Sequence, residues 1–90
     1  MTPEPAVRPL AMGTVEAVRV NLGLTVRDFC PLLSVSRQTY YNWVRSGQVP
    51  DGTRKRVRVR LRSLVRIADE YDLPDKSKER AAAMAGIVAA

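Results

Sequence analysis

The sequence contains no histidine and only one cysteine, Cys30, among its 90 residues. Structural metal sites in small domains are usually assembled from several cysteine and histidine ligands, so this chain cannot build one. A lone cysteine also cannot form a disulfide within the chain, which fits a reducing compartment. We therefore expect no metal and no cofactor, and we expect Cys30 to be a small apolar core residue rather than a reactive thiol.

Long apolar runs are also missing, since no stretch is long enough to span a bilayer and the N-terminus lacks the apolar core of a signal peptide. The protein is therefore expected to be soluble and cytoplasmic, with no membrane partner. A glycine-rich phosphate loop is absent as well, and Asp69, Glu70 and Asp72 are better explained by capping and solvent exposure than by a metal cluster. We expect no catalytic residues and no enzyme activity.

Positive charge is what the chain has in excess, because 15 Lys and Arg residues outnumber 9 Asp and Glu residues and give a net charge of +6. Ninety residues make one small domain, for which helical packing around a modest core is the usual solution. Seven of the cations fall between Arg54 and Arg66, and no acid lies between Asp51 and Asp69. This distribution favours a polyanionic partner, and phosphate neutralisation is the natural use of the dense stretch.

The centre of the chain has the pattern of two short helices joined by a tight turn. Apolar residues recur at helical spacing in Val26–Leu33 and again in Arg37–Arg45. Thr25 and Ser36 are suited to cap these two helices, and the pair Ser34-Val35 forms the turn between them. Helices this short cannot bury their apolar faces alone, so flanking segments must cover them.

The second of these helices is the best candidate for function. Tyr40, Trp43 and Val44 are expected to point inward from it. The outward face is shared by Arg37, Gln38, Tyr41, Asn42 and Arg45. Amide side chains can form paired hydrogen bonds with adenine, arginine can do so with guanine, and tyrosine can reach a phosphate or a thymine methyl. The pattern predicts contacts to base edges, and an ordinary solvated helix face is the alternative.

The segment ahead of this helix pair is expected to hold one more helix. Residues 1–13 contain three of the six prolines and are expected to form a flexible arm. A helix is then predicted from Thr14, which is suited to cap it, to about Asn21 and Gly23. Glu16 would lie favourably in its first turn.

The segment NLGLTVRDFCPLLSVSRQTYYNWVRSG resembles the helix-turn-helix of lambda-repressor-like and Cro-like regulators. The resemblance covers about residues 14 to 50, and spacing, caps and core types agree together. The chain departs from the usual residue types in having Cys30 for Ala at the small-residue position, Ser34 for the turn Gly and Val44 for a frequent Glu. It also has Pro31, which is expected to kink or shorten its helix. The matching positions are Leu24, Thr25, Cys30, Val35, Ser36, Tyr40 and Trp43.

This resemblance implies an all-α domain of four or five helices in which Arg37–Arg45 is the recognition helix that enters the major groove. Base contacts are implied for residues of that helix, chiefly Arg37, Gln38 and Asn42, with Tyr41 as a further candidate. Phosphate contacts are implied at the two helix starts, from Thr25, the Val26 backbone and Ser36. The implied partner is therefore double-stranded DNA.

The basic stretch that follows residue 50 fits two structures. RVRVRLR alternates as a strand would, which resembles the wing of excisionase-type domains, with strands near 54–62. A helix over Thr53–Tyr71 instead aligns a longer apolar stripe that ends at Tyr71 and leaves only Val59 misplaced, so we expect the helix. Four cations on the outer face of this predicted helix are expected to contact the DNA backbone, namely Lys55, Arg58, Arg62 and Arg66. Arg45 of the preceding helix is expected to do the same.

The C-terminal segment, residues 75–90, is expected to form an Ala-rich helix after Asp72 and Pro74 end the preceding one. Its shallow apolar stripe consists of Ala81, Met84, Ala85 and Val88. On so small a DNA binder this stripe is expected to pack or to form a two-fold dimer, because one recognition helix reads only a few base pairs. Docking on a protein partner is the alternative.

Together these features predict a DNA-binding domain over residues 14–74 that acts as a sequence-specific transcriptional regulator. We expect a homodimeric repressor. The further expectation that it is of a phage or mobile-element type depends on family analogy alone. Two alternatives stay open: an excisionase-like winged protein that bends DNA, and an antitoxin-type module that binds a protein as well as DNA.

Overall fold

The computed structural model describes residues 8–89 of the chain. Its elements are β1 (Leu10–Ala11), α1 (Met12–Leu22), α2 (Val26–Leu33), α3 (Arg37–Ser46), β2 (Gln48–Val49), α4 (Asp51–Glu70) and α5 (Ser77–Ala89). Helices dominate, and the only sheet in this part of the chain is the pairing of β1 with β2. The predicted small all-α fold is therefore confirmed. None of the described helices is long and apolar enough to cross a membrane.

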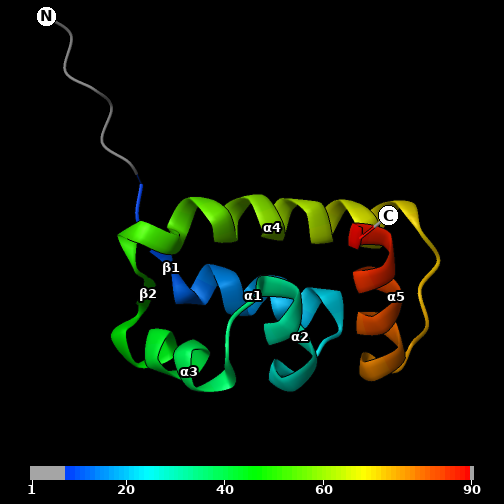
Figure 1. The fold of residues 1–90 in the computed structure, drawn as a ribbon, viewed down its shortest axis with the longest axis horizontal. Coiled ribbons are helices and arrows are strands. Elements are labelled where there is room, and N and C mark those ends of the chain that lie inside the picture. Colours follow the sequence, from blue (N-terminus) through cyan, green and yellow to red (C-terminus); the bar gives the residue numbers. More distant parts are fainter. Residues whose placement is uncertain (1–7, 90) are drawn as a thin grey trace, which may run out of the picture.

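The five helices are arranged in layers (Figure 1). α4 runs along one long edge of the molecule, and α3 lies at the opposite edge. α1 lies between α4 and α3 and packs against both, α2 packs against α3, α4 and α5, and α5 closes one end and also contacts α4. Each helix contributes at least one completely buried side chain to the core. From α1 to α5 in order, examples are Val15, Phe29, Tyr40, Leu64 and Met84.

The segment just before α1 is part of the fold, which corrects the predicted flexible arm. Leu10 pairs with Val49 in an antiparallel register, and the Met12 amide donates to a carbonyl at the end of α3 at 2.9 Å. Leu10 and Met12 are both buried. α1 therefore begins two residues before the predicted cap Thr14, because burial of two apolar side chains outweighs a capping preference. Residues 1–7 of the predicted arm lie outside the described part of the chain.

The turn between α2 and α3 passes through the left-handed conformation although it lacks glycine. Ser34 adopts the left-handed conformation, with a φ of 59°. The Ser34 amide donates to the Pro31 carbonyl and the Val35 amide donates to the Cys30 carbonyl, both at 3.1 Å. These two bonds satisfy carbonyls that would otherwise be left without partners at the end of α2. A side chain in this conformation costs roughly 1 kcal/mol.

Pro31 lies inside α2 without shortening it, so the helix reaches Leu33. The proline removes the hydrogen bond to the Arg27 carbonyl four residues back. Arg27 and Pro31 are both exposed, so water can hydrate that carbonyl and the loss is tolerated. Cys30 beside it is buried, which confirms the predicted core role, and burial raises the pKa of its thiol.

α4 resolves the ambiguity of the basic stretch in favour of the predicted helix. It is one continuous helix of 20 residues. The alternative prediction of strands near 54–62 is therefore wrong, and so is the winged fold that depends on those strands. Val57 and Leu64 face the core, whereas Val59 is 56% exposed as predicted. Tyr71, predicted to extend the stripe, lies beyond the helix end and is exposed. A stripe sustained over several helical turns outweighs a short alternation because only a helix can bury all of it on one side.

α5 covers the core of its own chain. Ala81 and Met84 are buried on the side that packs against α2 and α4, whereas Ala85 is exposed. Arg80 ties the start of α5 to α1 through a hydrogen bond from its Nε to the Leu22 carbonyl at 2.6 Å. Of the two roles predicted for the apolar stripe, packing is the one observed, and its buried side chains are not free to form a dimer.

Replacing Ser34 by glycine should stabilise the domain by up to about 1 kcal/mol, because glycine adopts the left-handed conformation without a steric penalty. Thermal unfolding followed by circular dichroism measures the change. The control is Ser63→Gly inside α4, where the same substitution should destabilise the domain by about 0.5 kcal/mol. A lower melting temperature for the Ser34 variant would contradict the described turn.

Candidate nucleic-acid interface

Two aromatic side chains hold α3 against the body of the molecule. Tyr40 is completely buried and Trp43 is 6% exposed, as predicted. The ring of Tyr40 meets the ring of Phe29 in α2 edge to face, with centroids 6.0 Å apart. Such a pair contributes about 0.5–1.5 kcal/mol beyond the apolar area that it buries. The contact restrains how α3 crosses α2.

A polar network anchors the same side of α3 to α1. The Tyr40 hydroxyl donates to the Glu16 carboxylate, and Arg19 donates to both oxygens of that carboxylate at 2.9 and 3.0 Å. Arg19 also donates to the Leu24 carbonyl at 2.8 Å. The hydrogen bonds from Arg19 and Tyr40 hold the pKa of Glu16 below its ordinary value, and burial raises the pKa of Tyr40. Glu16 therefore links two helices. The prediction that it lies in the first turn is wrong, because α1 begins at Met12 and places Glu16 in the second turn.

The side chains predicted to point outward from α3 lie together on its exposed face. All five are exposed, namely Arg37, Gln38, Tyr41, Asn42 and Arg45. They lie on the side of the helix opposite the buried Tyr40 and Trp43. The structure therefore collects two guanidinium groups, two amides and one aromatic ring on a single convex surface.

Asn42 and Arg45 are joined by a hydrogen bond on this surface. Arg45 donates from Nη2 to Asn42 Oδ1 at 2.7 Å. An amide oxygen has two lone pairs, so Asn42 keeps one acceptor site and its N–H donors for an adenine. Arg45 keeps its other N–H donors for a phosphate or a guanine. Because the pair is already ordered, it loses less conformational freedom on binding.

Val44 also belongs to this face, which corrects the prediction that it points inward. Its side chain is 43% exposed. Val44 follows Tyr40 by four residues, so helical spacing indicated the core, but the core ends before it. An exposed apolar side chain of this kind can contact the methyl group of thymine. Spacing alone could not have identified this residue, because spacing does not reveal where neighbouring elements stop covering a helix.

The start of α3 offers backbone donors. Ser36 Oγ accepts from the Thr39 amide at 3.1 Å and caps the helix as predicted. The first amides of a helix have no acceptor within it, so those of Arg37 and Gln38 can bind a phosphate. Ser36 therefore lies where the predicted backbone contact requires it.

The start of α2 differs from the start of α3 because the carboxylate of Asp28 lies in its first turn. Thr25 Oγ1 accepts from the Asp28 amide at 3.2 Å, and the Thr25 amide donates to Ser77 Oγ at 2.9 Å. Ser77 also donates to the Asp28 carboxylate at 2.6 Å, and this bond holds the pKa of Asp28 below its ordinary value. A carboxylate repels a phosphate, so Thr25 and Val26 are poorer candidates for backbone contact than Ser36.

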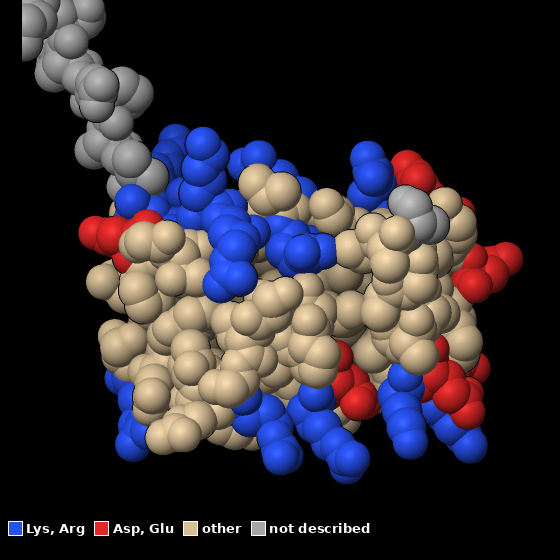
Figure 2. Space-filling model, in the orientation of Figure 1, with Lys and Arg blue, Asp and Glu red and all other residues tan. Residues whose placement is uncertain are grey.

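The predicted α4 contacts lie on a different edge of the molecule from α3. Lys55, Arg62 and Arg66 are exposed, and Arg58 is partly exposed. Figure 2 shows Lys and Arg side chains gathered over α4 along one edge, and further Lys and Arg side chains with Asp and Glu among them along the opposite edge, with a neutral band between. α1 lies between α4 and α3 and packs against both of them. The structure therefore does not bring these cations to the surface that α3 presents.

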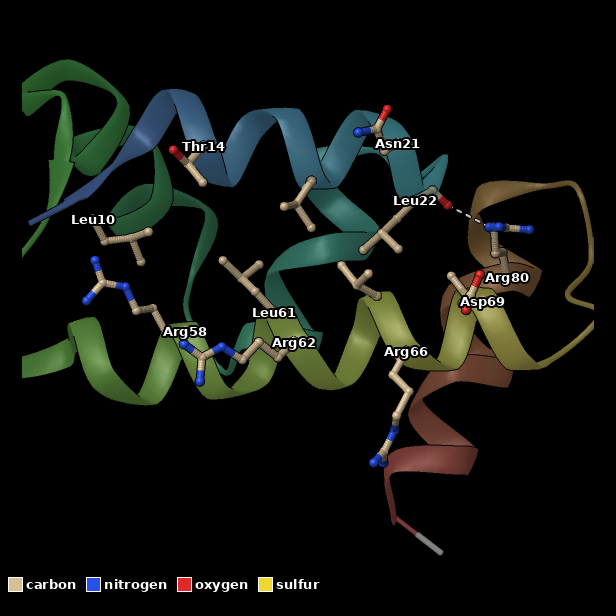
Figure 3. A pocket seen from close by; sticks show the side chains of 13 residues that line it. Leu10, Thr14, Asn21, Leu22, Arg58, Leu61, Arg62, Arg66, Asp69 and Arg80 are labelled. Carbon is tan, nitrogen blue, oxygen red and sulfur yellow. Dashed lines mark hydrogen bonds between the residues drawn. The ribbon is translucent and has the colours of Figure 1, made fainter. Parts of the chain in front are cut away.

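An open groove of about 820 Å³ lies between α1 and α4 (Figure 3). Leu22 and Leu61 contribute apolar surface to it, and Arg58 and Arg62 lie along its α4 side. Arg58 also donates from Nη2 to the Pro9 carbonyl at 3.1 Å. The groove shares its arginines with the outer face of α4, so it belongs to the positive edge away from α3.

No family model, curated protein or solved structure matches this chain. The likeness of residues 14–50 to lambda-repressor-like regulators therefore stays a prediction from the motif. Function is therefore inferred from the geometry and chemistry of α3 and α4.

Replacing Tyr40 by phenylalanine should destabilise the domain by about 1–2 kcal/mol, because the buried ring is kept while the Glu16 carboxylate loses a hydrogen bond. Denaturant unfolding near neutral pH measures the change. Tyr41→Phe removes an exposed hydroxyl from the next residue and should leave stability within about 0.5 kcal/mol. Equal losses in the two variants would argue against the network.

The lowered pKa of Glu16 predicts a loss of stability in acid. Its carboxylate stabilises the folded protein above the ordinary glutamate pKa of about 4.3, and that contribution disappears as the pH falls through the lower folded value. Glu16→Gln removes the titrating group, so its melting temperature should fall less steeply than that of the wild type between about pH 5 and pH 3. Parallel declines in the two proteins would contradict the role of Glu16.

Proposed function

We propose that this protein binds duplex DNA in a sequence-specific manner, with α3 in the major groove. The observation that supports this most is the outward face of α3, where Arg37, Gln38, Tyr41 and Asn42 are exposed on a helix whose other side is held in the core. The major groove is about 12 Å wide and admits an α-helix. The net charge of +6 fits a polyanionic partner.

The proposed contacts divide by chemistry. Gln38 and Asn42 have the amide groups that pair with adenine, and Arg37 has the guanidinium that pairs with guanine. Phosphates beside the groove are bound by Ser36, by the first amides of α3 and by Arg45. Base contacts supply sequence preference, while the phosphate contacts set the position of the protein on the duplex.

Regulation would follow from occupancy of an operator. A bound protein blocks polymerase sterically, so repression is the proposed outcome. One recognition helix reads only a few base pairs, and we therefore propose that two copies bind adjacent half-sites as a homodimer. Ala81 and Met84 are buried in their own chain, so this dimer uses another surface.

Selection from random duplexes tests the proposal. The protein is mixed with random duplex fragments, the salt is raised to about physiological strength, and the fragments that stay bound are sequenced. A recovered motif would establish sequence-specific binding, and an inverted repeat with half-sites about one helical turn apart would establish the dimer. Binding at low salt alone, without an enriched sequence, would contradict the proposal.

Asn42→Ala should weaken binding to the recovered motif by about 1–3 kcal/mol and relax the preference at one base pair. Asn21→Ala is the matched control, because it removes the same amide from an exposed position on α1 and should leave the affinity unchanged. Fluorescence anisotropy with a labelled duplex measures both variants. Equal affinities would show that Asn42 of α3 does not read the bases.

A further inference from the structure

The outer surface of α4 concentrates positive charge that binding through α3 leaves unused. We call it the α4 basic surface: Lys55, Arg58, Arg62 and Arg66 form its row, and Arg56 and Arg60 flank the row on the side where α5 packs. All six side chains are exposed or partly exposed, unlike Arg54, which is buried and pairs with Asp51 at 3.2 Å. Asp69 and Glu70 follow at the end of the helix and bound the surface there.

Within the part of the chain that the structure describes, no ion pair involves any of the six cations. Arg58, Arg62 and Arg66 follow one another at intervals of four residues, and like charges at that spacing on a helix repel each other. A polyanion bound to this surface would relieve the repulsion and would release its own counterions.

The dimensions and the side chains of the surface suit a duplex backbone. Lys55 and Arg66 are eleven residues apart, which corresponds to about 16 Å along an α-helix. Duplex DNA has one negative charge per about 1.7 Å of its axis, so a segment of that length presents several phosphates to the row. α4 contains no Asn or Gln, so the surface can bind phosphates but lacks the amides that read adenine.

The α4 basic surface and α3 lie on opposite edges of the molecule with α1 between them (Figures 1 and 2). A duplex seated on α3 therefore does not reach the α4 basic surface at the same site. We propose that the α4 basic surface binds the phosphate backbone of a second duplex segment, so that one molecule joins two segments of DNA. This inference rests on the proposed function, because α3 must hold the first segment.

A capture experiment with two duplexes tests the inference. The duplex recovered by selection is fixed to beads and saturated with the full chain, unbound protein is washed away, and a fluorescent duplex of random sequence is added. The wild type should retain the fluorescent duplex. The double variant Arg62→Ala/Arg66→Ala should bind the fixed duplex with unchanged affinity. It should retain at least about tenfold less of the second duplex, and the log–log salt dependence of retention should be shallower by about two.

The matched control is Arg62→Lys/Arg66→Lys, which keeps both charges and should keep the capture, because attraction to phosphate depends chiefly on charge. Thermal melting shows whether the alanine variant is folded. Both side chains are exposed and lie in the row of like charges, so their removal should leave the melting temperature unchanged or raise it.

Three results would overturn the inference alone. The wild type could bind the fixed duplex and retain no second one. The alanine variant could retain as much as the wild type, as a dimer with a free α3 face would. The alanine variant could also lose the fixed duplex, which would place α4 in the first interface. A wild type that binds no fixed duplex would instead overturn the proposed function, and this inference with it.

Discussion

The carboxylate of Glu16 is the group on which the presentation of α3 depends. It accepts hydrogen bonds from Tyr40 in α3 and from Arg19 in its own helix, and Arg19 reaches on to the chain before α2. Hydrogen bonds to an ionised group are stronger than those between neutral groups, so this link resists rotation of α3. Phe29 packs on the same tyrosine ring, so polar and apolar contacts restrain one residue together. The outward face of α3 keeps its direction because its inward face is held in two ways.

Much of the fold could be predicted because its signals are local. A capping residue satisfies amides within its own turn, and a helical stripe of apolar residues is visible along a single segment. The pairing of Leu10 with Val49 and the bond between Glu16 and Tyr40 join residues that are distant in the sequence. No local pattern marks such partners, so local signals alone predict an arm from a proline-rich segment and a dipole effect from an acid near a helix start.

The residues of the candidate site could be predicted from the sequence, but their arrangement in space could not. Helical periodicity identified five outward residues of α3, but it assigned Val44 to the core because it cannot show where the core ends. Periodicity likewise identified the cations of α4 without showing which way they face relative to α3. That relation is set by α1, which packs between the two helices, and it is encoded in neither of them alone. The separation of the α4 cations from the outward face of α3 is therefore a property of the packing.

The two-residue pairing of β1 with β2 also affects the order in which the chain folds. Leu10 and Val49 are 39 residues apart, so their contact closes a loop that contains α1, α2 and α3. Closing such a loop costs conformational entropy, which is offset only when the enclosed helices have packed. α2 and α3 are neighbours in the sequence and can associate before this closure. We therefore expect the C-terminal end of α3 to be tethered last, and local opening of that helix in the folded protein to begin at this end.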